Sequence, residues 1–163
     1  MATAETVDLG PAHPPKAESI EVFNKIHVDL KKALQHKRHE TNKHEPQYFQ
    51  AVANLSDQQL TNFSSYADEM AWFTADDLKE VRVATAAYGK HILGKVLIPD
   101  SDPMHSFPEK PSDAYFMFRA FVPGDADTAT LHCIRMDEEE RPDGDKVFKA
   151  IFHQNDPIVW FDI

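Results

Sequence analysis

The sequence is poor in cysteine and glycine, and each scarcity excludes some classes of fold and chemistry. A single cysteine, Cys133, cannot form a disulfide within the chain, as expected of a protein from a reducing compartment. The five glycines build neither a glycine-rich phosphate-binding loop nor the Gly-x-Ser-x-Gly turn of α/β-hydrolases. The common nucleotide-binding and hydrolase motifs are therefore absent.

Long apolar runs and an excess of basic residues are also missing. No apolar run reaches the length of a membrane span, and residues 1–15 lack the basic start and apolar core of a secretory signal. The net charge of −10 argues against nucleic acid as the main partner, because phosphate binding needs a basic footprint. We expect a cytoplasmic protein that binds neither membrane nor nucleic acid.

The chain has 163 residues, of which 42% are hydrophobic, so it can bury a core in one domain without disulfides. We expect residues 1–16 to be a flexible tail and residues 17–163 to form that domain. Charge is unevenly spread: residues 31–44 are rich in Lys, Arg and His, whereas residues 100–145 are rich in Asp and Glu. These segments either attract each other, within or between chains, or are simply solvated surface.

Helical spacing dominates residues 17–98. A first helix is predicted from Ala17 to about His39, with Ile20, Phe23, Ile26, Leu30 and Leu34 on one stripe. Ser56 and Gln59 form a capping box that opens a second helix. Its apolar face consists of Leu60, Phe63, Ala67 and Met70.

A third helix is predicted to begin at the cap formed by residues 74–77 and to end near Gly94. Its apolar stripe consists of Leu78, Val81, Thr85, Tyr88 and Ile92. Residues 113–163 instead predict four antiparallel strands, with turns at residues 123–127, 141–144 and 155–156. The fold class is therefore α+β: a helical N-terminal half packed on one face of a C-terminal four-stranded antiparallel β-meander.

The turn Arg141-Pro142-Asp143-Gly144 sets the register of the middle hairpin, because it suits a type I turn with a glycine bulge. This register places Asp137 opposite Lys149, Arg135 opposite Ile151 and Cys133 opposite His153. Continued across residues 155–156, it places His153 opposite Ile158 and Ile151 opposite Trp160. In the first strand, Phe116, Phe118 and Ala120 face the core, whereas Tyr115, Met117, Arg119 and Phe121 lie on a second, amphipathic face.

The amphipathic face has the composition of a protein interface, because Trp, Tyr and Arg are frequent anchors there. Our leading hypothesis is homodimer or partner-protein binding through this face. The expected contact residues are Tyr115, Met117, Arg119, Phe121, Arg135, His153 and Trp160.

The alternative is an isomerase, lyase or cyclase that acts on a small molecule in an apolar pocket. His153 or His132 would be the general acid/base, and Arg119 or Arg135 would hold an anionic group. Cys133 is a candidate nucleophile with His153 as its base, whereas His132 is expected on the opposite side of the strand. The sequence does not decide whether the protein is an enzyme.

A histidine-rich stretch near the end of the first helix is the one candidate for a metal site. His36, Glu40 and His44 would share a helix face at a spacing that can hold zinc or iron. The spacing completes no known metal motif, and neighbouring basic residues would repel a cation. We expect neither a metal nor another cofactor.

Overall fold

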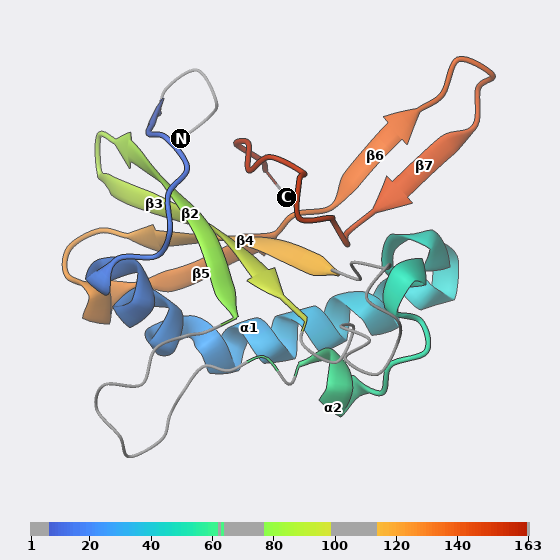
Figure 1. The fold of residues 1–163 in the computed structure, drawn as a ribbon, viewed down its shortest axis with the longest axis horizontal. Coiled ribbons are helices and arrows are strands. Elements are labelled where there is room, and N and C mark those ends of the chain that lie inside the picture. The colour runs from blue at the N-terminus through green and yellow to red at the C-terminus, as the bar shows by residue number, and fades with distance from the viewer. Residues whose placement is uncertain (1–6, 62, 64–76, 99–113, 163) are drawn as a thin grey trace.

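The computed structural model describes residues 7–61, 63, 77–98 and 114–162. Helical elements are α1 (Ala17–His44), the 3₁₀ helix η1 (Pro46–Val52), α2 (Asp57–Leu60) and the 3₁₀ helix η3 (Ala126–Thr128). The main strands are β1 (Asp8–Leu9), β2 (Leu78–Ala86), β3 (Gly89–Leu97), β4 (Tyr115–Val122) and β5 (Thr130–Ile134). They form one antiparallel sheet in the order β1-β2-β3-β4-β5 (Figure 1).

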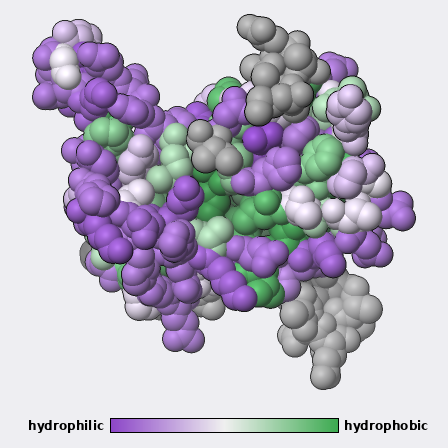
Figure 2. Space-filling view, turned by 180° about the vertical axis from the view of Figure 1, so that it is seen from behind, coloured by the Kyte–Doolittle hydropathy of each residue, from purple (hydrophilic) through white to green (hydrophobic). Residues whose placement is uncertain are grey.

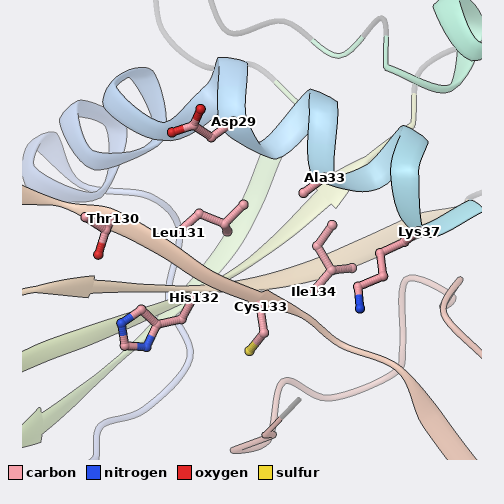
Figure 3. A pocket seen from close by; sticks show the side chains of 8 residues that line it. All are labelled: Asp29, Ala33, Lys37, Thr130, Leu131, His132, Cys133 and Ile134. Atoms are coloured by element: carbon pink, nitrogen blue, oxygen red, sulfur yellow. The ribbon is translucent and has the colours of Figure 1, made fainter.

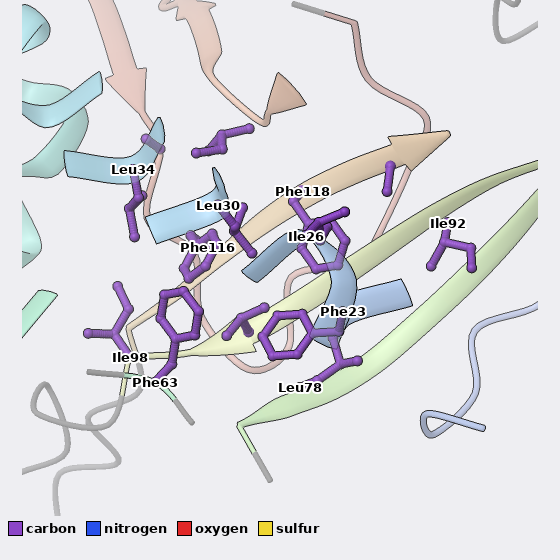
Figure 4. Close-up of a cluster of buried hydrophobic side chains, with 14 of the residues drawn as sticks. Phe23, Ile26, Leu30, Leu34, Phe63, Leu78, Ile92, Ile98, Phe116 and Phe118 are labelled. Carbon is purple, nitrogen blue, oxygen red and sulfur yellow. The ribbon is translucent and has the colours of Figure 1, made fainter. Parts of the chain in front are cut away.

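Helix α1 packs on one face of this sheet, which confirms the α+β class and the helix-on-sheet arrangement. Its predicted stripe is buried, since Phe23, Leu30 and Leu34 are fully inaccessible to solvent. The aromatic rings of Phe23 and Phe118 lie 5.8 Å apart between helix and sheet (Figure 4). The helix begins at Ala17 as predicted and continues to His44, beyond the expected end near His39.

The prediction of a third helix is wrong for residues 78–97, which form the hairpin of β2 and β3. Strand β3 lies in the middle of the sheet and is covered on both faces, so its apolar residues do not alternate with polar ones. The sequence therefore lacks the alternation by which a strand is usually predicted. Gly89 at the start of β3 has a φ of 148°, which favours glycine. The main sheet consequently has five strands. The second half of the second predicted helix lies outside the described residues.

Part of the predicted flexible tail is paired with the sheet. Asp8–Leu9 forms β1 against β2, and His13 makes an isolated bridge with Val81. The backbone of His13 both donates to and accepts from Val81, at 3.0 and 2.9 Å. Backbone pairing of this kind needs no particular side chain, so the tail's composition does not reveal it.

The RPDG turn sets the predicted register, but only for a short hairpin. Asp137 pairs with Lys149, and the Arg141 amide donates to the Asp145 carbonyl oxygen at 2.7 Å. Strands β6 (Asp137–Glu140) and β7 (Lys146–Lys149) form a separate two-stranded sheet, a hydrophilic arm that projects from the body (Figures 1 and 2).

The register does not extend beyond this arm, so the predicted pairs Cys133–His153 and Arg135–Ile151 are wrong. Cys133 pairs with Arg119 in β4, and the Arg135 amide donates to the Met117 carbonyl oxygen at 2.8 Å. Phe152 instead bridges Tyr115, at the same edge of β4 but beyond the point where β5 ends. The chain leaves the main sheet after residue 135, and this departure ends the hairpin pairing.

Residues 152–162 cover the second face of the sheet instead of forming the predicted last strand. The pairs predicted across the turn at 155–156 are therefore absent from the described segment. The Arg82 guanidinium donates to the Ile158 carbonyl oxygen at 2.7 Å and holds the segment in place. A second apolar cluster fills the space beneath it: Ala84, Leu93, Met117, Cys133, Phe152, Ile158 and Phe161.

The two oppositely charged segments form ion pairs locally. Arg38 pairs with Asp57 at the start of α2, whereas Lys146 pairs with Glu138 within the arm. Among the described residues, no ion pair joins residues 31–44 to the acidic arm. Their attraction within one chain is therefore not part of the described fold.

Candidate functional site

A β-bulge in β5 determines which side chains meet on the second face. Arg119 pairs with Cys133 and Ala120 with Leu131, so His132 is an extra residue in β5. Leu131 and Ile134 point toward α1, whereas His132 and Cys133 both point away from it (Figure 3). The expectation that His132 and Cys133 lie on opposite sides of the strand is wrong, because the bulge interrupts the alternation.

The bulge places His132 in a ring of aromatic and imidazole groups around a buried arginine. The Arg119 cluster, as we name it, consists of His91, Arg119, Phe121, His132 and Trp160. The His91 ring lies 4.9 Å from Phe121, 5.7 Å from His132 and 5.0 Å from Trp160, measured between ring centres. The Arg119 guanidinium carbon lies 4.4 Å from the centre of the Trp160 ring, in a cation–π contact.

Arg119 is a buried cation that lacks a close carboxylate and a full set of hydrogen-bond acceptors among the described residues. Its side chain is only 8% exposed, and its nearest carboxylate partner among the described residues is Asp162, with an N–O distance of 3.8 Å. Its Nη1 lies 3.3 Å from His91 Nδ1, where the imidazole nitrogen is an acceptor. Within the described part of the chain, the buried Nε has no hydrogen-bond partner, and neither has the buried indole Nε1 of Trp160. Unpaired buried donors are costly unless something else accepts from them.

The protonation states favour neutral bases beside this cation. Burial, helped by the charges of Arg119 and His132, lowers the pKa of His91 to about 4. Partial desolvation and the charge of Arg119 also lower the pKa of His132. Burial raises the pKa of the Cys133 thiol, although a hydrogen bond to Arg119 partly opposes this. At neutral pH the site therefore holds neutral imidazoles and a protonated thiol, which is a poor nucleophile.

Other predicted site residues lie apart from the Arg119 cluster. The Arg135 guanidinium binds Asp137 with two hydrogen bonds of 3.0 and 2.9 Å and packs over the Phe152 ring. His153 is exposed, and its backbone amide donates to Asp156 Oδ2 at 2.7 Å. Tyr115 is buried beneath Lys95, whose ammonium nitrogen lies 5.2 Å from the ring centre. Lys95 donates to the carbonyl oxygens of Gln154 and Asp156, and Arg135 donates to that of Pro157, so these two side chains hold the C-terminal segment on the sheet.

Met117 is fully buried beneath that segment, and Tyr115 and Arg119 are each 6% exposed. The face expected to bind a second copy is thus occupied in large part by residues 152–162 of the same chain. Phe121 and Trp160 remain half-buried at its margin, and His132 is exposed there.

The metal candidates His36, Glu40 and His44 are exposed on α1. Over the ranges that the structure describes, no group of three or more His, Cys, Asp or Glu side chains could hold a metal ion. Nearby, His39 binds Asp57 instead, with 2.8 Å between His39 Nε2 and Asp57 Oδ2.

His91 is the site residue that sequence reasoning missed. It lies in β3, within the segment predicted as helix, so it was not considered as a neighbour of Arg119. The signal was the Tyr88-Gly89 turn followed by the near-continuous buried run of β3, which is typical of a central strand.

No protein-family model matches this chain, and neither a curated protein nor a solved structure shows significant similarity to it. In the described part of the chain, no helix has the length and apolar character needed to cross a membrane. The function must therefore be inferred from the site itself.

Proposed function

We propose that this protein binds a small organic anion at the Arg119 cluster and that His132 exchanges a proton with the bound molecule. The observation that carries this proposal is the buried Arg119 guanidinium: among the described residues, no carboxylate lies closer to it than 3.8 Å and its Nε has no hydrogen-bond partner. An anionic oxygen would supply the acceptor that this cation lacks.

Asp162 provides a partial substitute for such a ligand. Its side chain is 64% exposed, and its carboxylate lies at the margin of the cluster, beyond hydrogen-bond distance from Arg119. A carboxylate or phosphate on a small molecule could approach closely and form two parallel hydrogen bonds, which Asp162 does not form. Asp162 would then compete with the ligand for the same charge.

The rings around Arg119 favour a ligand with a planar, apolar body. Phe121 and His132 are stacked, with ring centres 5.4 Å apart, and the Trp160 indole adds a third wall. His132 is neutral at pH 7 and exposed, so it can accept a proton from a molecule that Arg119 holds. Isomerases and lyases of small organic acids require such a step.

Isothermal titration with benzoate tests the proposal, with benzyl alcohol as the uncharged comparison. We expect the chain to bind benzoate in preference to benzyl alcohol. Arg119→Gln should abolish this preference, whereas Asp162→Asn should strengthen benzoate binding by roughly threefold to tenfold, because a competing surface carboxylate is removed.

Arg135→Gln is the matched control, since Arg135 is another largely buried arginine on the same face but is already paired with Asp137. It should leave benzoate binding within about twofold of wild type. Far-UV circular dichroism would confirm that each variant is folded. Benzoate binding that survives Arg119→Gln, or that weakens in Asp162→Asn, would refute the proposal.

A further inference from the structure

Strand β5 is an edge of the main sheet, with β4 on one side and no described strand on the other. Cys133 pairs with Arg119, and the Arg135 amide donates to Met117. By the alternation of an antiparallel ladder between these two positions, the backbone groups of Ile134 therefore point away from β4. A strand edge of this kind can pair with another chain.

A hollow of about 390 Å³ lies between this edge and α1. Its helix side presents Asp29, Ala33 and Lys37, one residue per turn, and Figure 3 shows them above β5 in that order, from Thr130 toward Ile134. Asp29 and Lys37 form no ion pair with any residue in the described ranges. The hollow thus has a free negative charge at one end, a free positive charge at the other and a small side chain between them.

This arrangement of charge is complementary to a reversed copy of itself. A two-fold axis perpendicular to the sheet and close to Ala33 would place the two β5 edges antiparallel, with both α1 helices on the same face of the joined sheet. Asp29 would then lie opposite Lys37 of the second copy, and Lys37 opposite its Asp29. Farther out, the exposed Lys25 and Glu40 repeat the pattern with the opposite signs.

We propose that a second copy of this chain docks in the hollow, so that the protein is a symmetric dimer joined through β5 and α1. The small Ala33 side chain lets the two helices approach near the axis. Val28, which is 50% exposed beside Asp29, supplies apolar contact. Because β5 is short and contains a bulge, the backbone ladder alone would be weak, and the helix charges determine the register.

Charge reversal and its rescue test this interface in the full chain. Sedimentation velocity over a range of concentrations should give a mass twice the 18.5 kDa of the chain. Asp29→Lys or Lys37→Asp should each raise the dimer Kd by roughly tenfold to a hundredfold, since each puts two like-charged pairs across the axis. The double variant Asp29→Lys/Lys37→Asp should restore dimerisation.

Glu139→Lys, on the exposed arm, changes the net charge as Asp29→Lys does and should leave the dimer intact. A wild-type chain that stays monomeric at all concentrations would overturn the proposal. So would single variants that dimerise normally, or a double variant that does not recover. His132 lines both this hollow and the Arg119 cluster, but neither Asp29 nor Lys37 belongs to that cluster, so their variants test the dimer without removing an anion-binding group.

Discussion

The Phe118 ring lies where the side chain of residue 94 would be, and this contact explains a glycine in the middle of β3. A Cβ atom built on Gly94 would lie 2.4 Å from Cε1 of Phe118 and 3.0 Å from Cδ1 of Leu78. The neighbouring strand and α1 enclose the ring, so it has little room to move. The sequence suggests a helix end at Gly94, but the structure shows a space for an aromatic ring.

Gly94→Ala should therefore destabilise the fold by about 1–3 kcal/mol, because a methyl group would overpack the core. Urea unfolding followed by circular dichroism would measure the change in free energy. Gly124→Ala is the control: its new Cβ would lie no closer than 3.6 Å to other atoms, so we expect a change within about 0.5 kcal/mol. Equal losses in the two variants would argue against the proposed crowding.

Stability should fall as the pH decreases from about 6.5 to about 4, in part because of His91. The folded protein holds the pKa of His91 at about 4, whereas the unfolded chain has an ordinary histidine pKa of 6.5. Between these values the unfolded state binds a proton that the folded state excludes, so acidification favours unfolding. After allowance for solvent screening, this effect is about 1–2 kcal/mol.

Urea unfolding at pH 7 and pH 4.5 would measure this effect in wild type and in His91→Gln. The variant keeps a polar group near Arg119 but cannot titrate. We expect it to lose less stability on acidification than wild type, by about 1–2 kcal/mol. An identical loss in both proteins would show that His91 is not excluded from protonation in the folded state.

At the scale of elements, the segment of residues 152–162 covers the second face of the sheet. Ile158 is 1% exposed and belongs to the same apolar cluster as Cys133, whereas its neighbour Val159 is 40% exposed. The two residues are adjacent and have similar apolar side chains. Substituting each of them therefore compares a buried with an exposed position for nearly the same side chain.

Ile158→Ala should cost about 2–4 kcal/mol and speed the reaction of the Cys133 thiol with Ellman's reagent, because a looser cover exposes the thiol more often. Val159→Ala should change stability by no more than about 0.5 kcal/mol and leave the thiol reaction rate unchanged. Stability and thiol labelling are independent measurements. Similar effects of the two substitutions would mean that the segment does not pack on the sheet as described.

For the whole molecule, sequence patterns predicted the parts of the fold that depend on local signals. The stripe on α1 has helical spacing, the Ser56–Gln59 capping box forms both of its hydrogen bonds, and the RPDG turn sets the register of its own hairpin. The alternation in β4 is also as predicted, with Phe116 and Phe118 in the core beneath α1. Each of these features is decided by residues close together in the chain.

The remaining features depend on residues that are far apart in the chain. Strand β3 is recognised as a strand only once the elements that cover its two faces are known. The C-terminal segment is held by Lys95 in β3 and Arg82 in β2, which are far from it in the sequence. The composition of the second face was predicted in part, since Arg119, Phe121 and Trp160 do meet there. Their meeting with His91 could not be predicted, because it required the correct assignment of the β2–β3 hairpin.

Because His132 is an extra residue in β5, the Arg119 cluster depends on the number of residues in this strand as well as on their identity. If one residue were deleted from β5, regular alternation would return, and an imidazole and a thiol could no longer occupy adjacent positions on one side. Such a deletion would dismantle the Arg119 cluster even if every side chain in it were kept. When homologous sequences are compared, the spacing between positions 119 and 133 therefore deserves as much weight as the residues themselves.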